Sequence, residues 1–324
     1  MTLTRRDMAA ALAASVGLTA LPRMVRAAGG PLKVAIALPG SIADGGWSQS
    51  AFEVLSQART ELQAETAYSE KVHQPQQVEV LSDYARRGYN LVIGHGGEFQ
   101  DAVDRVAARF PKTSFLVTNG LRPSANVATA DFYFSQPAYL LGFLAARISK
   151  TGKVGIIAAQ KFKFTNDSVA GFEAGFRAAR NDGQVVTTWT GDWDDVAKGK
   201  EAAVNQLAQG VDIVWPTMDS ATAGSLQAVR EKGAMAFGLY YDAITKWPDI
   251  TLQSAILDVR GLLFDMLAKA KAEGLAGRNY KFDITMPQAV RLGSFGPKVP
   301  PETVAEITAL IERMKSGQLA VQPV

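Results

Sequence analysis

Side chains that could bind a small molecule recur where β-like runs of the sequence end. Tryptophan offers a flat face to a planar ring, a carboxylate accepts hydrogen bonds, and glycine lets the backbone approach a ligand closely. In open α/β sheets, ligands lie outside the carboxyl ends of the strands, so such residues would gather in one crevice. The candidates are Ser41, Asp44, Trp47 and Ser48 after the first run, then His95, Gly96 and Glu98, then Asn119, Trp215, Asp219 and Asp242.

Two tryptophans among these candidates have both a structural and a functional interpretation. Trp47 follows a Ser/Asp/Gly turn in "LPGSIADGGWSQSAFEVL", at the start of a predicted helix. Its indole could staple the helix to the sheet, or stand exposed until a ligand covers it. Trp215 could be a core residue of its strand, or a second indole facing the first across a cleft. We expect a clamp, in which each stack contributes ~1–3 kcal/mol by analogy with nucleic-acid bases.

The polar candidates also have structural alternatives. Asp44 and Ser41 are suited to capping the predicted helix, a role compatible with ligand contact. Asp242 sits in a Tyr-Asp turn, where its carboxylate either forms the turn or accepts hydrogen bonds from ligand hydroxyl or N–H groups. His95 lies in "GHGGEF", more than twenty positions from His73, so no zinc site is expected.

No nucleotide P-loop, G-x-S-x-G elbow or dinucleotide fingerprint is present in the sequence. We therefore expect no cofactor, no metal and no catalytic constellation.

The elements that must position these residues follow a regular order. Apolar β-like runs alternate with amphipathic helical segments throughout the chain, which predicts the α/β class with two doubly wound parallel sheets. No Ser/Gly-rich or Pro-rich linker separates the halves, so crossing strands should join the two lobes. We expect lobe 1 in 31–132 plus 246–290, and lobe 2 in 133–245 plus 291–324.

The first 27 residues have the features of an export signal. They combine the twin arginine of "TRRDMA", an alanine-rich apolar run and small residues near "VRAA". The pattern is Tat-like, and Sec export remains an alternative. The chain contains no cysteine, hence no lipobox cysteine. We expect a periplasmic, freely soluble protein without a lipid anchor.

Removing residues 1–27 changes the charge balance. The whole chain carries a formal charge of +3, and four arginines minus one aspartate in the signal account for three positive charges, which leaves about zero. No Lys/Arg-rich run suggests a nucleic-acid footprint. Nucleic acid is therefore not an expected partner.

Several longer stretches resemble one known family. They are "GSIADGGWSQSAF", similar to a G-x-I-x-D-x-x-F-N-x-x-A opening, "VIGHGGEFQDAV", "AYLLGFLAARISKTGKVGIIAA", "VAGFEAGFRAA", and "GVDIVWPTMDSATAGSLQAV" with "FGLYYD". Together they resemble the basic membrane protein family of ABC-transporter solute-binding proteins, which includes purine-nucleoside receptors. The resemblance covers nearly all of the chain after the signal, and it implies a type I periplasmic-binding fold whose two lobes close over a ligand.

The resemblance also implies roles for individual residues. The family's stacking phenylalanine in the opening motif falls on Trp47, and its second aromatic falls on Trp215. The family's acidic residue after the "GV" strand falls on Asp242, its strand-end aspartate on Asn119, and its opening asparagine on Ser48.

Two departures from the family affect the expected ligand. Where nucleoside receptors carry a lysine, "TLQSAILD" has Leu257, which removes an expected ribose contact. Asn119 in place of an acid also changes the hydrogen bonds that the site offers. A free nucleobase or another nitrogen heterocycle is therefore as well supported as a nucleoside.

These observations predict a monomeric, non-enzymatic binding protein that hands a purine-like molecule to an ABC permease in the inner membrane. Two other classes are an exported nucleoside-processing enzyme, which needs an acid/base or metal cluster, and a cytoplasmic sugar-responsive regulator of similar fold. The export signal and the lack of an N-terminal helix-turn-helix oppose the regulator.

Overall fold

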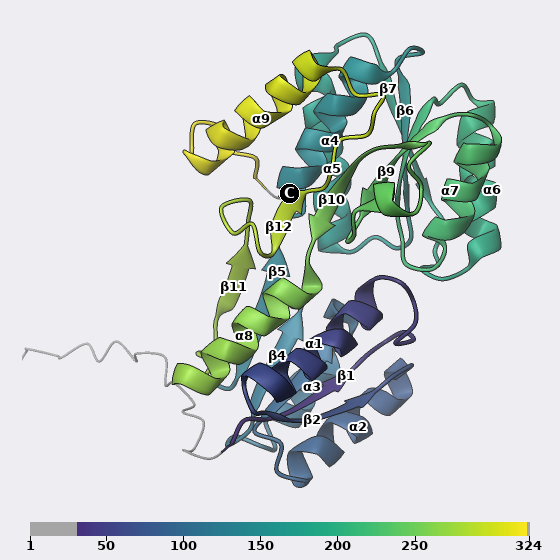
Figure 1. Cartoon of the computed structure of the whole chain (residues 1–324). Coiled ribbons are helices and arrows are strands. Elements are labelled where there is room, and N and C mark those ends of the chain that lie inside the picture. The colour runs from purple at the N-terminus through teal and green to yellow at the C-terminus, as the bar shows by residue number, and fades with distance from the viewer. Residues whose placement is uncertain (1–30, 323–324) are drawn as a thin grey trace, which may run out of the picture.

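The computed structural model describes residues 31–322, so the predicted export signal at 1–27 lies outside the described residues. The described chain forms two lobes, each built on a six-stranded sheet (Figure 1). The strand orders are β11-β5-β4-β3-β1-β2 and β12-β10-β9-β8-β6-β7. Every strand pair is parallel except β10 with β12. The predicted α/β class with two doubly wound parallel sheets is confirmed.

Lobe 1 contains the first five strands and two later elements. Its elements are β1 (Lys33–Ala37), α1 (Trp47–Glu61), β2 (Glu65–Ser69), α2 (Gln74–Arg86), β3 (Leu91–His95), η1 (Gly97–Phe99), α3 (Gln100–Ala107), β4 (Ser114–Thr118), β5 (Val127–Phe132), α8 (Val259–Glu273) and β11 (Asn279–Phe282).

Lobe 2 contains the middle of the chain and its C-terminal helix. Its elements are α4 (Ser135–Ile148), β6 (Lys153–Ala158), α5 (Lys163–Ala179), β7 (Gln184–Trp189), α6 (Val196–Ala208), β8 (Ile213–Thr217), α7 (Thr222–Glu231), β9 (Met235–Leu239), η2 (Ala243–Thr245), β10 (Thr251–Leu257), β12 (Val290–Leu292) and α9 (Pro301–Lys315).

Helices cover both faces of each sheet because successive strand residues point to opposite faces. In β1, Val34 and Ile36 pack in the core that includes α1, whereas Ala35 and Ala37 pack in the core that includes α2 and α3. The inner strands, such as β3 and β4, are buried on both faces and therefore read as apolar runs. This layering leaves the strand ends free to form a site.

The chain crosses between the lobes three times, after β5, after β10 and after β11 (Figure 1). The expected assignment of 246–290 to lobe 1 differs from the structure, because β10 pairs with β9 and belongs to the second sheet. The chain returns to lobe 1 only at Asp258, whose carboxylate caps α8. A strand and the helix that follows it are thus divided between two lobes.

The packing of α4 against α5 explains the "YLLGFLAA" and "VAGFEAGF" stretches. A Cβ at Gly142 would lie 1.9 Å from the carbonyl oxygen of Phe172, and one at Gly175 would lie 1.9 Å from that of Tyr139. Only glycine allows the two backbones to approach this closely. These two stretches therefore serve helix packing in lobe 2. Within residues 31–322, no helix is long and apolar enough to cross a membrane.

Candidate functional site

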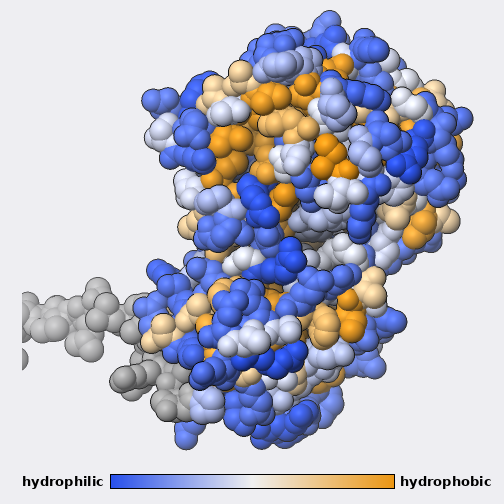
Figure 2. Space-filling view, in the orientation of Figure 1, coloured by the Kyte–Doolittle hydropathy of each residue, from blue (hydrophilic) through white to orange (hydrophobic). Residues whose placement is uncertain are grey.

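A cavity of about 220 Å³ lies between the lobes, at the carboxyl ends of strands from both sheets. Figure 2 shows the two lobes as separate masses that meet at a narrow waist. An adjoining cavity of about 100 Å³ shares Gly97, Asn119, Phe162 and Phe164 with the first. The larger cavity is lined by Pro39, Gly40, Asp44, Trp47, His73, Gly96, Gly97, Glu98 and Asn119 of lobe 1, and by Phe162, Phe164, Trp193, Asp194, Asp219 and Tyr240 of lobe 2.

Polar side chains hold the turn between β1 and α1. The Asp44 carboxylate accepts hydrogen bonds from three backbone N–H groups at 2.7–3.1 Å, one of them that of Ser48. The Ser48 hydroxyl accepts one from the Gly40 N–H at 3.2 Å, and the Ser41 hydroxyl accepts one from the N–H two residues on at 3.3 Å. Ser41 and Ser48 therefore shape the turn without lining the cavity, whereas Asp44 does both.

The Trp47 indole is already covered by protein. It is 6% exposed, and its ring stacks on His95 with the ring centroids 4.1 Å apart and an angle of 18° between the planes. Tyr240 of lobe 2 lies 5.8 Å from it. The expectation that Trp47 stands exposed until a ligand covers it is wrong, because β3 and lobe 2 supply its cover. Trp47 still contributes to the cavity wall.

His95 lies beneath Trp47 and is completely buried. Its Nε2–H donates to the backbone oxygen of Trp47 at 3.2 Å, because a carbonyl can only accept, and its Nδ1 then accepts from the Thr118 hydroxyl at 3.0 Å. Burial lowers the pKa of His95 to about 3, against the smaller opposing effect of the Trp47 carbonyl. The neutral imidazole is therefore a support for the Trp47 ring and does not line the cavity.

Three aromatic rings of lobe 2 form a stacked group, which we call the aromatic shelf: Phe162, Phe164 and Trp193. The ring centroids of Phe162 and Phe164 are 5.8 Å apart at 8°, and Trp193 lies 5.9 Å from Phe164 at 22°. Phe162 is 36% exposed. The shelf presents flat apolar faces to the cavity, opposite the residues of lobe 1.

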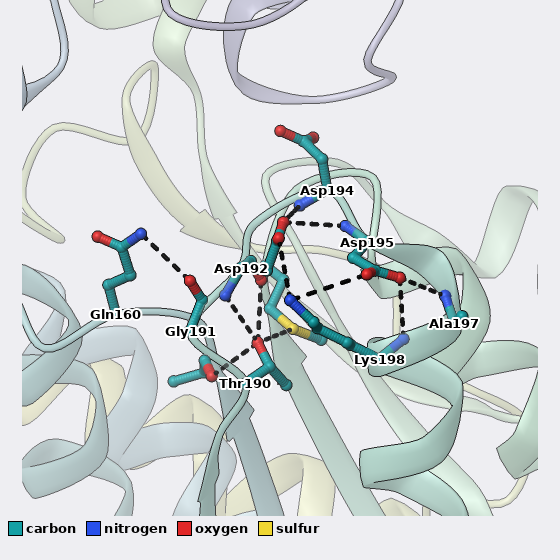
Figure 3. A network of polar contacts seen from close by, with 10 residues as sticks. Gln160, Thr190, Gly191, Asp192, Asp194, Asp195, Ala197 and Lys198 are labelled. Carbon is teal, nitrogen blue, oxygen red and sulfur yellow. Dashed lines mark hydrogen bonds and ion pairs between the residues drawn. The ribbon is translucent and has the colours of Figure 1, made fainter. Parts of the chain in front are cut away.

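The loop that carries Trp193 is fixed by its own polar side chains (Figure 3). Asp192 Oδ1 accepts hydrogen bonds from the N–H groups of Asp194 and Asp195 at 3.0 and 3.1 Å, and its Oδ2 pairs with Lys198 Nζ at 3.3 Å. Asp195 caps α6. The Asp194 carboxylate points away from this network (Figure 3), into the lining of the cavity. The loop is thus organised before any ligand arrives.

Carboxylates from both lobes meet in the cavity. Glu98 is solvent-exposed and Asp219 is half-buried, although many protein atoms surround each carboxylate. Burial raises the pKa of Glu98 to about 7. Burial, followed by the charges of Asp44, Asp194 and Glu98, raises the pKa of Asp219 well above its usual value. Ionising both carboxyl groups at once is therefore unfavourable in this cavity.

Two cavity residues adopt left-handed backbone conformations. Asn119 has φ of 54° directly after β4, and Tyr240 has φ of 69° directly after β9, the strand that holds the corresponding place in the other sheet. Such conformations are strained for residues other than glycine and cluster at functional sites. Asn119 is also 9% exposed, and its buried Oδ1 has no hydrogen-bond partner within the described chain.

Trp215 is not at the cavity, contrary to the expected clamp. It is 1% exposed, its indole N–H donates to the carbonyl oxygen of Gly238 at 3.3 Å, and its ring stacks on Phe172 of α5 with centroids 5.6 Å apart. Trp215 is buried because it lies inside β8, which continues to Thr217, and its side chain points to the face of the sheet that α5 covers. Its alternative interpretation as a core residue agrees with the structure.

Asp242 also lies away from the cavity. Its carboxylate accepts hydrogen bonds from the Ser294 N–H at 2.9 Å and from the Ser254 hydroxyl at 3.5 Å. These contacts fasten the β9–η2 turn to β10 and to the segment after β12. The predicted role of Asp242 as a turn residue fits these contacts, whereas its predicted ligand contact is absent from the cavity lining.

On the lobe 2 side, the sequence analysis missed five cavity residues. They are Phe162, Phe164, Trp193, Asp194 and Tyr240. The first two follow β6, the next two follow β7, and the last follows β9. The rule that sites lie at strand ends would have found them had it been applied to "QKFKFT" and "TGDWDD".

Comparison with known proteins agrees with this architecture. A family model described as "ABC transporter substrate-binding protein PnrA-like" matches residues 32–292. The chain belongs to this family. The resemblance to basic membrane proteins is confirmed, and the PnrA-like family consists of substrate-binding components of ABC transporters, which work with a permease and a small ligand.

The names of similar proteins describe different functions. Transcriptional activator protein med of Bacillus subtilis is 26% identical over 290 residues, which cover 89% of this chain and 90% of the relative. A purine-binding protein of Brucella abortus is 30% identical over 250 residues, which cover 75% of this chain and 69% of the relative.

Solved structures share the fold of this PnrA-like chain. A solute-binding protein of Conexibacter woesei has a TM-score of 0.70 at 26% identity and covers 90% of this chain and 99% of its own. A solute-binding protein of Aeropyrum pernix has a TM-score of 0.77 at 21% identity and covers 91% of this chain and 94% of its own. The expected type I periplasmic-binding fold is confirmed.

Proposed function

We propose that this chain is the periplasmic receptor of an ABC importer and that it captures a purine-like nitrogen heterocycle between its lobes. The observation that carries the proposal is the aromatic shelf, which faces carboxylates across a cavity built from both lobes. Flat aromatic faces stack on a planar ring, and carboxylates accept hydrogen bonds from ring N–H and amino groups. A purine-like base offers both features.

The mechanism that we propose is binding coupled to lobe closure. A ligand that touches both lobes favours the closed arrangement by its differential affinity for that arrangement. Phe162, Phe164 and Trp193 would hold the ring on lobe 2, while Glu98 and Asn119 would contact its polar edge from lobe 1. The closed complex would then be recognised by the permease and release its ligand there.

Two relatives support a purine-like ligand by name, the purine-binding protein of Brucella abortus and a nucleoside-binding protein of Lactococcus lactis, which is 32% identical over 131 residues. The choice between nucleobase and nucleoside depends on what fills the adjoining cavity near Asp131 and Lys163. Both classes belong in the first binding experiments.

The proposal is tested by mass spectrometry of small molecules that co-purify with the protein, followed by calorimetry with adenine, guanine, adenosine and guanosine. Trp193→Ala should weaken binding by ~1–3 kcal/mol, the contribution of one stacked base. Trp189→Ala is the matched control, because Trp189 lies four residues earlier in β7 and outside the cavity lining.

Equal loss of affinity in the two variants would contradict the aromatic shelf as the binding surface. The absence of binding by all four compounds would contradict a purine-like ligand. The export part of the proposal is tested separately by cell fractionation, in which replacing the twin arginine Arg5 and Arg6 by lysines should retain a Tat substrate in the cytoplasm.

A further inference from the structure

The larger cavity offers hydrogen-bond acceptors and negative charge, with no basic side chain of Lys or Arg among its described lining residues. Four carboxylates line it: Asp44, Glu98, Asp194 and Asp219. Asp44 is already engaged by backbone N–H groups at the start of α1. Within the described chain, no other side chain donates a hydrogen bond to Glu98 or Asp219. These two carboxylates are therefore available to accept hydrogen bonds from a ligand or to face its positive charge.

An independent observation points to a ligand with donors. Asn119 lines both cavities and is 9% exposed, and its Oδ1 has no hydrogen-bond partner within residues 31–322. A buried acceptor without a partner is unfavourable, and Asn119 also has a strained backbone conformation. Such a cost is offset when a bound molecule donates a hydrogen bond.

The basic side chains of the adjoining cavity do not neutralise this charge. Lys163 and Arg122 line the adjoining cavity, and each has acidic partners there. Lys163 pairs with Asp167 at 3.0 Å, and Arg122 pairs with Asp104 at 2.9 Å. Their charges are thus matched locally, and the charge of the larger cavity is left to its ligand.

We propose that the ligand binds as a cation, a protonated or N-alkylated nitrogen heterocycle whose positive charge lies between Glu98, Asp219 and the aromatic shelf. The inference deepens the proposed function and rests on it. Aromatic faces attract a cation through their quadrupole, so the shelf and the carboxylates favour the same ligand charge. Charge-assisted hydrogen bonds to the carboxylates are about twice as strong as neutral ones.

The electrostatics of the larger cavity fit this ligand. Burial and the neighbouring carboxylates oppose ionisation of Asp219, and burial opposes ionisation of Glu98. A bound cation would favour the ionised form of both groups, whereas a neutral ligand would leave their mutual repulsion in place.

The test uses two pairs of probes that differ in charge: adenosine with 1-methyladenosine, and nicotinamide with 1-methylnicotinamide. Calorimetry on the purified protein at neutral pH should show each cation binding at least about tenfold more tightly than its neutral counterpart. In the double variant Glu98→Gln, Asp219→Asn, the preference should fall to within about threefold. Asp182→Asn is the control, because its side chain is 84% exposed and remote from the cavity lining.

Asp194→Asn provides a second variant, since Asp194 is exposed on its loop and its replacement does not alter the core. It should reduce the cation preference in the same direction. Neutral probes that bind as tightly as the cations to the wild type would overturn the cation inference and leave the proposed function standing. A preference that survives both the double variant and Asp194→Asn would also overturn it. Failure of all four probes would overturn the cation inference, and only if adenine, guanine and guanosine also failed to bind would it contradict the proposed function itself.

Discussion

Lowering the pH should destabilise the protein through His95, which is completely buried and neutral. Its pKa is about 3 in the folded protein, against 6.5 for an ordinary histidine. Between these values the unfolded chain binds a proton that the folded chain does not, so the free energy of unfolding falls as the pH falls. At ~1.4 kcal/mol per pH unit, the loss is roughly 3 kcal/mol between pH 6.5 and 4.5, and roughly 5 kcal/mol in full. The stabilisation is complete above pH 6.5.

The assay is urea unfolding at pH values from 4.5 to 7.5, for the wild type and for His95→Gln. Glu98, with a pKa of about 7, acts in the opposite direction, because its ionisation on raising the pH from 4.5 to 7 disfavours the folded state. The difference in unfolding free energy between wild type and variant removes this shared contribution. That difference should shrink by roughly 3 kcal/mol from pH 6.5 to 4.5.

His73→Gln is the matched control, because His73 is the other histidine of the chain and is exposed at the start of α2. Its variant should follow the wild-type profile. If the gap between wild type and His95→Gln stays constant over this pH range, His95 is not a buried neutral group and the reasoning is refuted.

Three further predictions concern the site and the core. Trp215→Ala should cost about 3–5 kcal/mol of stability by leaving a cavity in the core. Its ligand affinity, measured below the lowered melting temperature, should remain close to wild type. A loss of affinity without a loss of stability would show that Trp215 belongs to the binding site. Asn119→Ala should weaken ligand binding about tenfold in calorimetry, whereas Asp242→Ala should leave the affinity within about twofold, and the reverse order would contradict the cavity assignment. Gly175→Ala should lower stability by about 1–3 kcal/mol in thermal unfolding, since the new methyl group would force α5 away from the Tyr139 carbonyl, and an unchanged melting temperature would show that the helices adapt freely.

The fold could be predicted because local patterns alternate clearly along the chain. Buried strands such as β3 and β4 read as apolar runs, and the helices between them carry one apolar face. The boundary between the lobes was harder to predict, because no local sequence pattern indicates which sheet a strand joins. β10 is followed directly by α8, yet β10 pairs with β9 in one lobe while α8 packs on α1 in the other.

The site could be predicted only where a strand end was identified correctly. Asp44, Glu98 and Asp219 follow their strands closely and line the cavity as expected. The prediction for Trp215 was wrong because β8 continues for two residues beyond it, so Trp215 is not at the strand end. Its position along the strand decides which face of the sheet its side chain points to. Trp193 was missed because a tryptophan in an acidic loop carries no periodic signal, and its position depends on hydrogen bonds made by neighbouring aspartates.

The three crossings between the lobes have a consequence for biosynthesis. Lobe 1 begins at the N-terminal end of the described chain, yet its edge strand β11 comes much later. In the pairing of β11 with β5, Asn279 lies opposite Thr129, which is far from it in the sequence. While a ribosome is still making lobe 2, β5 therefore presents an unpaired edge to its surroundings, a hazard for pairing with another nascent chain. The first lobe to emerge cannot be completed until most of the second has been made, so a fragment that stops before β11 should aggregate rather than fold as an independent lobe.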